Sequence, residues 1–158
     1  MQRELLIGCG SERTKRLTCD GSKDWSNLTT LDYNPDHKPD VVWDLMQAAL
    51  PFEDNSFDEI HAYEVLEHIG PQGDYHLFFA QFTEFHRILK PNGYLVASVP
   101  HWASMWAWGD PSHSRIINEG TLAFLSQAEY VKQVGKTPMT DFRYLYKADF
   151  KTSWMSIS

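Results

Sequence analysis

Short apolar runs separated by polar segments dominate the first hundred residues of the chain. A run of four to seven apolar residues between turn signals is typical of a strand buried in a parallel sheet. Residues 40–43 fit either a short edge strand or an extended loop. The pattern therefore predicts central strands over residues 4–7, 28–31, 57–62 and 94–99.

Helical periodicity is clearest after Gly70. Phe78, Phe82, Phe85 and Leu89 recur at spacings that place them on one face of a helix. A Lys-Pro-Asn-Gly exit at residues 90–93 ends that pattern. We further expect a short or irregular helix within 11–27, a helix over 119–134, and a terminal strand pair from 142–150 and 153–157.

Strands and helices alternate along the chain, and no repeat, linker or low-complexity tract divides it. Alternation of this kind favours an α/β fold with a single doubly wound, mostly parallel sheet. A chain of 158 residues is large enough for one core. We therefore predict a single domain over residues 1–158.

Two features at the carboxyl ends of the first strands indicate a nucleoside site. Gly8 and Gly10 form a turn after the first strand, and Asp32 ends the second. A bare backbone beside a ribose-binding carboxylate is how parallel α/β sheets hold a nucleoside. A dinucleotide fold would place a third glycine at Arg13, so a nicotinamide oxidoreductase is disfavoured.

A series of motifs follows in order along the chain: Leu-Ile-Gly-Cys-Gly at 6–10, Leu31-Asp32, and residues 39–45, 50–52, 55–60, 64–69 and 85–95. This series resembles the class I S-adenosylmethionine-dependent methyltransferase family, in the form of its small members. The resemblance implies a Rossmann-like methyltransferase fold, S-adenosylmethionine as cofactor, and methyl transfer as activity. Two departures from the family pattern, Glu12 in the glycine turn and a weakly helical segment between Gly10 and Leu28, fit a compact variant with a minimal N-terminal cap.

The resemblance also implies which residues hold the methionine end of the cofactor. The backbone of Gly8, Cys9 and Gly10 would approach the methionine portion, and Glu64 would lie beside its amino group or sulfonium. The small Cys9 side chain also fits a purely structural place in the turn. The third glycine of the family pattern is Glu12 here, so the path of the loop differs from the usual one.

At the adenosine end, the resemblance implies that Asp32 accepts hydrogen bonds from the ribose hydroxyls and that Tyr33 packs beside the adenine. Asp44 would bind the exocyclic amine, and the Leu45 N–H would serve a ring nitrogen. Taken alone, Asp32 and Asp44 equally fit acids that form turns or cap helices.

Methyl transfer needs a general base only where the acceptor must lose a proton. His68, His101 and His113 are the candidates, because each follows a strand or lies in a loop expected at the same edge. The alternative for His68 is to brace a helix start, and for His113 to belong to a capped turn with Asp110. No pair of histidines or cysteines has zinc-site spacing, so we predict no metal.

Residues 101–108 form the predicted acceptor-facing surface. Trp102, Trp106 and Trp108 fall within seven residues and are able to stack on a sugar or a planar ring. If the segment is helical, Trp102 and Trp106 share a face and one of them packs on the sheet.

Charge and composition narrow the partners. The net charge is −7, and residues 32–84 contain twelve acidic residues against one basic residue, Lys38. Such a balance argues against nucleic acid and favours a small-molecule or glycan-type acceptor, methylated on oxygen or nitrogen. The acidic region fits a solvated face or a rim for a cationic ligand. With no signal peptide or membrane span in the sequence, we expect a cytoplasmic protein.

A different class of function also fits the sequence. The chain would then be a cofactor-binding module, or a non-catalytic subunit, that needs a partner protein to complete its acceptor site. A homodimer would supply the same cover.

Overall fold

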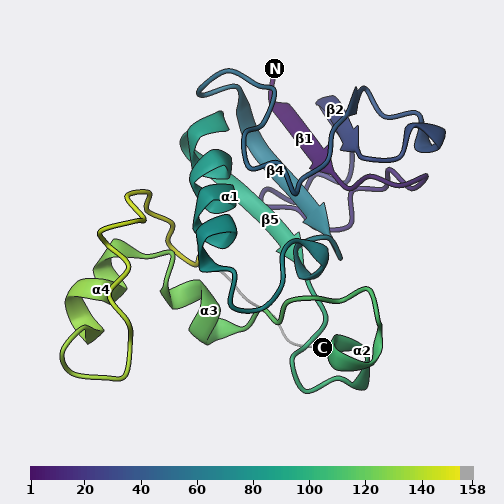
Figure 1. The fold of residues 1–158 in the computed structure, drawn as a ribbon. Helices are drawn as coiled ribbons and strands as arrows, with labels where there is room; N and C mark the ends of the chain where they lie inside the picture. The colour runs from purple at the N-terminus through teal and green to yellow at the C-terminus, as the bar shows by residue number, and fades with distance from the viewer. Residues whose placement is uncertain (154–158) are drawn as a thin grey trace.

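The computed structural model describes residues 1–153, which build one sheet of five parallel strands (Figure 1). The strand order is β3-β2-β1-β4-β5, so the chain winds outward from β1 in both directions. This order confirms the predicted doubly wound sheet. The strands are β1 (Arg3–Ile7), β2 (Asn27–Asp32), β3 (Val41–Val42), β4 (Phe57–Tyr63) and β5 (Leu89–Ser98).

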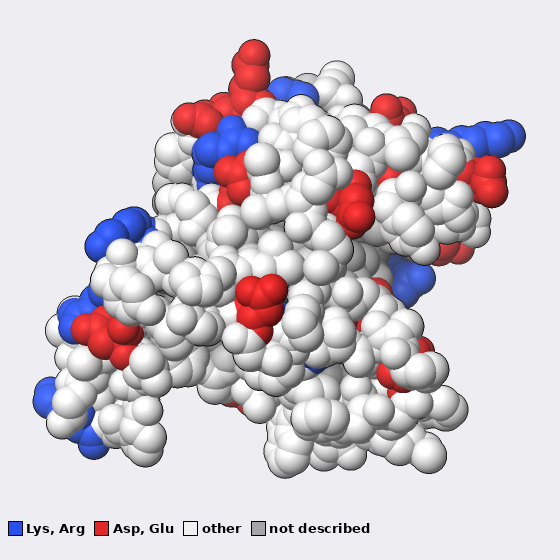
Figure 2. Space-filling model, viewed as in Figure 1, with Lys and Arg blue, Asp and Glu red and all other residues white. Residues whose placement is uncertain are grey.

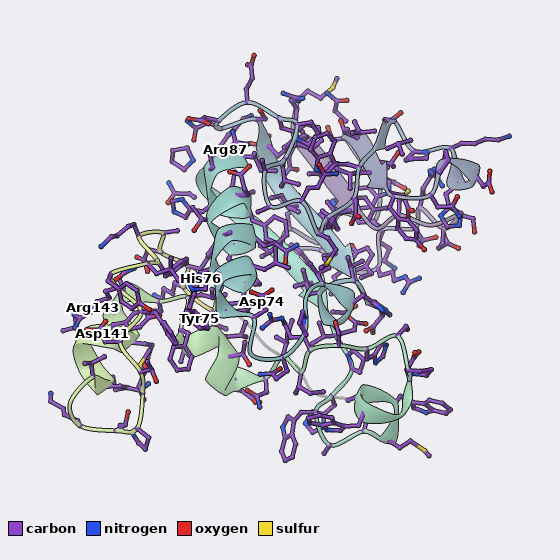
Figure 3. The ribbon with its side chains drawn as sticks, viewed as in Figure 1. Asp74, Tyr75, His76, Arg87, Asp141 and Arg143 are labelled. Atoms are coloured by element: carbon purple, nitrogen blue, oxygen red, sulfur yellow. The ribbon has the colours of Figure 1, made fainter. Side chains whose placement is uncertain are left out.

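The longest helix, α1 (Tyr75–Ile88), covers one face of the sheet (Figure 1). It begins where the Asp74 carboxylate accepts a hydrogen bond from the Leu77 N–H, at 3.1 Å. Asp74 and Arg87 lie at its opposite ends (Figure 3). Phe78, Phe82 and Phe85 are buried on one side of the helix, as their spacing predicts.

Leu89 does not belong to that helix, because the backbone turns extended there and β5 begins. Leu89 pairs with Phe57, and after an irregularity Tyr94 pairs with Glu59. Asn92 adopts a φ of 65° within this irregular stretch. The predicted strand over 94–99 is therefore the second half of a longer one.

The predicted helix within residues 11–27 is absent, and the chain there is irregular. Short polar side chains satisfy the backbone locally instead of leaving it to helical bonds. The Asp20 N–H donates to Thr18 Oγ1 at 3.3 Å, and the Ser22 N–H donates to Asp20 Oδ1 at 2.9 Å. Prediction of a helix there was wrong for this reason.

Beyond β5 the chain forms short helices, α2 (Met105–Gly109), α3 (Glu119–Ala123) and α4 (Gln127–Gln133). The single helix predicted over 119–134 is thus two. Each has its own cap, since Asn118 accepts from the Thr121 N–H and Ser126 from the Glu129 N–H. Caps of this kind start a new helix rather than continue an old one.

Residues 142–150 form no strand, contrary to the expected terminal pair, and 154–157 lie outside the described residues. Alternation fails at Tyr144, which is exposed, while Tyr146 is fully buried. The Tyr146 N–H bonds to the Phe142 carbonyl in a turn, at 2.8 Å. Phe142 and Tyr146 then pack on Phe79 of α1, so this segment covers the helix instead of extending the sheet.

The carboxyl ends of the strands point toward α2 and α3 (Figure 1). In parallel α/β sheets this edge is where ligands bind. Two 3-10 turns also lie at this edge, η1 (Pro35–His37) after β2 and η2 (Leu66–His68) after β4. Within residues 1–153, no helix has the length and apolar character needed to cross a membrane.

Candidate functional site

The glycine turn after β1 has the conformation that the sequence suggested. Gly8 and Gly10 have φ values of +60° and +54°, which favour glycine. A Cβ at Gly8 would lie 2.5 Å from Val65 Cγ2, so this glycine lets the turn pack against the segment after β4. A Cβ at Gly10 would meet no atom within 4 Å. The turn therefore leaves open space beside the Cα of Gly10, while Cys9 is buried.

Asp32 holds this edge together. Its carboxylate accepts hydrogen bonds from the N–H groups of Gly10 and Asn34, both at 2.8 Å, and His37 Nδ1 lies 3.3 Å away. Burial opposes its charge, yet these donors hold the pKa of Asp32 below its usual value. Asp32 is thus ionised at neutral pH and placed beside the glycine turn. Contact with a ribose remains a prediction.

Arg13 is a residue of this site that the sequence indicated only as a misfit. Its guanidinium donates to the Gly10 carbonyl at 3.0 Å and to the His37 carbonyl at 2.7 Å. It therefore links the glycine turn, which follows β1, to η1, which follows the neighbouring strand β2. The signal for this role was a long basic side chain three residues after the second glycine.

The remaining adenosine-side residues lie on the loops that follow β2 and β3. Tyr33 is 74% exposed. The Asp44 carboxylate accepts from the Met46 N–H at 2.9 Å, so it forms the turn that was its alternative role. The Leu45 side chain is buried in the core. No contact among these residues tests their predicted roles toward adenine.

Glu64 follows β4 in a backbone conformation that is rare for its residue type. Its φ is +55°, and its N–H donates to the Ser98 carbonyl at the end of β5, at 2.9 Å. A left-handed non-glycine residue costs about 1–3 kcal/mol and tends to occur at functional sites. The Glu64 backbone is thereby fixed at the carboxyl edge, and its side chain is exposed there.

Three residues away, a second acid forms a cluster with two of the predicted histidines. The Glu67 side chain is 4% exposed, and His68 Nε2 and His113 Nε2 lie 3.8 and 3.9 Å from its Oε1. The two rings are 4.8 Å apart. Burial, with the negative charges of Glu64 and Asp110, raises the pKa of Glu67 to about 8. Sequence reasoning missed Glu67, although its place beside His68 was visible.

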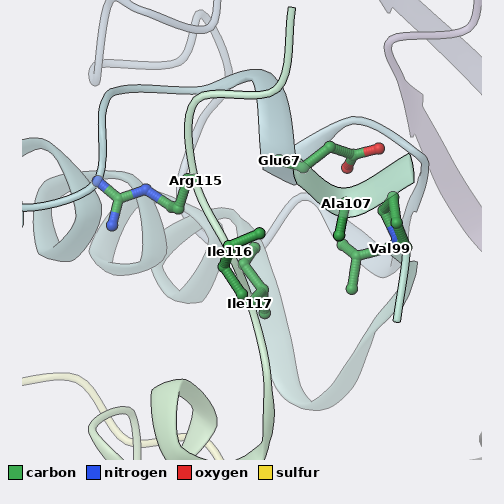
Figure 4. A pocket seen from close by; sticks show the side chains of 7 residues that line it. Glu67, Val99, Ala107, Arg115, Ile116 and Ile117 are labelled. Atoms are coloured by element: carbon green, nitrogen blue, oxygen red, sulfur yellow. The ribbon is translucent and has the colours of Figure 1, made fainter. Parts of the chain in front are cut away.

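Hydrogen bonds between residues 114–115 and η2 bring this cluster together. The Glu67 carbonyl accepts from the N–H groups of Ser114 and Arg115, at 2.9 and 3.1 Å. Arg115 is buried and donates to the Asp74 carbonyl at 2.8 Å. Glu67 and Arg115 line a narrow crevice with Val99, Ala107, Ile116 and Ile117, and their charged groups point away from each other (Figure 4).

His101 is separate in its contacts from the other two histidines. Its Nδ1 accepts from the Ala103 N–H at 3.2 Å, and its ring lies 5.5 Å from that of Trp102. It therefore shapes the turn after β5, at the edge where a base was expected. A role as base for His101, His68 or His113 stays a prediction.

The tryptophan segment is more exposed than expected. Helix α2 begins only at Met105, so Trp102 and Trp106 do not share a helical face, and packing of one of them on the sheet was the wrong expectation. Trp102, Trp106 and Trp108 are 48%, 66% and 71% exposed. The Trp108 Nε1–H donates to the Trp102 carbonyl and holds the segment together, at 3.1 Å. Met105 extends this apolar surface.

In the described part of the chain, charged side chains on one face of the molecule form no continuous patch of one sign (Figure 2). Figure 2 shows acidic and basic groups of both signs scattered over this face. Within the acidic stretch of the sequence, several acids have basic partners: Glu84 and Asp54 bind Arg87, and Asp58 binds Lys90. Paired surface acids therefore account for three of the twelve acidic residues in that stretch, and Asp32, Glu59 and Glu67 are buried.

Comparison with family models gives the decisive match. Residues 5–97 match a family described as "Methyltransferase domain". The chain belongs to this methyltransferase family. The matched residues run from β1 through β5 and include the glycine turn, Asp32 and Glu64. The expected family is thereby confirmed, as is its Rossmann-like fold. No curated protein sequence matches the chain.

Solved structures share this fold at low sequence identity. A SAM-dependent methyltransferase from Archaeoglobus fulgidus is 22% identical, with a TM-score of 0.57, over 78% of this chain and 57% of its own. The YcgJ protein from Bacillus subtilis is 19% identical, with a TM-score of 0.50, over 83% and 60%. The cyclase SpnF is 20% identical, with a TM-score of 0.50, over 77% and 48%.

The chain thus spans about half to three-fifths of the length of these structures. One of them is described as a cyclase, so the shared fold does not by itself fix the reaction.

Proposed function

We propose that this chain binds S-adenosylmethionine and transfers its methyl group to a small-molecule or glycan-type acceptor, on oxygen or nitrogen. The observation that supports this most strongly is the gathering of the glycine turn, Asp32 and Glu64 at one edge of the sheet, within the residues that match the methyltransferase family.

The geometry supports a nucleoside with a cationic centre over a dinucleotide. Arg13 takes the position of the third dinucleotide glycine and spans the gap to η1. The Asp32 carboxylate, held by backbone N–H groups, suits ribose hydroxyls, and the exposed Glu64 carboxylate suits a positively charged sulfonium with its amino group. The reaction needs little from the protein beyond orientation, because the sulfonium carries its own leaving group.

The proposed acceptor class is supported by exposed aromatic side chains and by the net charge of the protein. Exposed Trp102, Trp106 and Trp108 offer stacking faces near the end of β5. His101 lies at the start of this segment and is our candidate base for a hydroxyl acceptor. The net charge of −7 disfavours a nucleic acid acceptor.

The test of the proposal is calorimetric titration of the protein with S-adenosylhomocysteine, with NAD in parallel. We expect micromolar binding of the first and none of the second. Asp32→Ala should weaken binding tenfold or more, a loss of about 1.4 kcal/mol. Asp36→Ala, which removes an exposed acid from the neighbouring turn, is the matched control and should bind as the wild type does. Unchanged affinity in Asp32→Ala would remove Asp32 from the site.

A cofactor-binding module completed by a partner is the second candidate. The exposed Trp102, Met105, Trp106 and Trp108 favour it, because such an apolar surface is typical of an interface. Binding of S-adenosylhomocysteine by a folded chain that forms a stable complex with another protein, and methylates only within it, would support this candidate.

A further inference from the structure

The cluster of Glu67, His68 and His113 is not accounted for by the cofactor site. Each contributes one ligand-type atom, and the three atoms lie within 4.8 Å of one another. They come from η2 and from the loop before α3, forty-five residues apart. Two imidazoles and a carboxylate form a donor set that binds divalent metal ions in many proteins.

Among residues 1–153, the Glu67 carboxylate has no hydrogen-bond partner. Both of its oxygens are buried and unpaired, as is Nδ1 of His113. A buried polar group without a partner costs about 1–3 kcal/mol, and more when it is charged. The buried cation nearest in the crevice, Arg115, points away and donates to backbone carbonyls instead. The fold therefore leaves the Glu67 carboxylate as a buried acceptor that a bound cation would pair.

His68 is oriented as a metal-ligating histidine usually is. His68 Nδ1 lies 3.0 Å from the Ser112 carbonyl, so it carries the proton and donates, which leaves Nε2 free to bind. That Nε2 is the atom nearest Glu67. Ligating histidines characteristically donate their other ring N–H to a carbonyl or carboxylate in this way.

We propose that Glu67, His68 and His113 bind a divalent transition-metal ion of the Zn²⁺ or Co²⁺ type. Asp110 is the fourth candidate ligand, since its Oδ2 lies 3.6 Å from His113 Nε2. Its other oxygen accepts from the Ser112 N–H and hydroxyl, which fixes its direction.

The distances fit such an ion. Bonds of about 2.1 Å in a tetrahedron separate ligand atoms by about 3.4 Å. Three pairs of these atoms are 3.6–3.9 Å apart, and the atoms of Glu67, His68 and His113 all lie within 4.8 Å of one another, so the side chains must move inward to bind the ion. Two imidazoles favour Zn²⁺ or Co²⁺ over Mg²⁺, which prefers oxygen ligands. His68 and His113 are then ligands rather than bases, which leaves His101 as candidate base.

The experiment titrates the full chain with Co²⁺, followed by its visible absorption, and with Zn²⁺ by calorimetry. We expect one ion per chain and a visible band that Zn²⁺ displaces. Glu67→Gln and His113→Asn should each weaken binding by more than about tenfold, and Asp110→Asn by less. His76→Asn, which removes an exposed histidine of α1, is the control and should bind as the wild type does.

Circular dichroism of each variant separates loss of binding from loss of fold. If Glu67→Gln does not fold, His68→Asn decides, because that ring is partly exposed. The proposal is overturned if the folded wild type binds neither ion, or if the cluster variants bind as tightly as His76→Asn. The titration contains no nucleoside, so its result is independent of the S-adenosylhomocysteine test.

Discussion

The two faces of the sheet are buried by different means. On one face, α1 lays Phe78, Phe82 and Phe85 against apolar residues such as Ile60 of β4. On the other face, the irregular segment 11–26 covers strands that carry charged groups, among them Glu4 of β1. Because side chains alternate along a strand, β4 contributes apolar residues to one face of the sheet and polar residues to the other.

The polar face is a network of buried, paired groups. Lys15 Nζ lies 2.8 Å from Glu4 Oε1 and 3.8 Å from Glu59 Oε2. His61 joins Glu59 through Nε2, at 2.6 Å, and the Tyr63 hydroxyl through Nδ1, at 2.7 Å. Trp25 packs edge-on against His61.

The difference shows two ways to close a sheet. The α1 face needs apolar area, which any well-packed helix supplies. The Lys15 face needs particular partners in particular places, because each buried charge must be matched. Segment 11–26 covers this face by pairing buried charges, which does not require helical periodicity in its sequence.

The largest effect should come from the apolar face. Phe85 is fully buried between α1 and the sheet. Phe85→Ala should lower the free energy of unfolding by about 4 kcal/mol, through lost burial and a cavity. Urea unfolding measures it, with Tyr144→Ala as control, since that ring is 69% exposed. A loss as small as that of the control would mean that the α1 face is loosely packed.

The next effect tests whether the polar face depends on pairing. Lys15→Met keeps the side-chain length but leaves Glu4 buried without its cation, at a cost of about 3 kcal/mol. Lys23→Met, at an exposed position in the same segment, should change stability little.

A second substitution distinguishes charge from packing. Glu4→Gln added to Lys15→Met removes the unpaired charge and keeps an acceptor for the Ser26 N–H. It should restore part of the lost stability in the same unfolding assay. If the double variant is no more stable than Lys15→Met, then packing of the lysine stem, and not its charge, closes this face.

The smallest effect concerns pH. Burial, against the pull of Glu59, lowers the pKa of His61 below its usual value of 6.5. The unfolded chain therefore takes up a proton at this histidine first as pH falls below 6.5, so His61 contributes a loss of stability in acid. Lys15 and Glu4 also face this group.

Between pH 7 and 5 we expect a contribution on the order of 1 kcal/mol, measured as unfolding free energy against pH. His61→Gln should lack this contribution, so its unfolding free energy at pH 5 relative to pH 7 should be higher than that of the wild type. Equal slopes would mean that another group accounts for the acid sensitivity.

The sequence predicted the α1 face more fully than the polar one. Phe78, Phe82 and Phe85 report a helix through their spacing, and four apolar runs report the central strands. Leu89 and residues 119–134 were misassigned, because a cap or an extended residue ends a helix where periodicity alone continues it. Residues 11–27 were misassigned because their backbone bonds go to nearby side chains.

The residues of the candidate site likewise divide into those that the sequence revealed and those that it did not. Gly8, Gly10 and Asp32 were recognisable because local backbone geometry and a strand end fix them. Arg13 and Glu67 were not, because their roles depend on His37 and on His113, which the chain brings near only by folding.

By itself the sequence determined the presence of the central strands, the helix α1 and the family, since local periodicity and the order of motifs carry that information. Tertiary structure alone decided what covers each face of the sheet and which charged groups meet. Glu67 and His113, like Lys15 and Glu59, come together through the packing of distant segments, and residue spacing contains no record of such contacts.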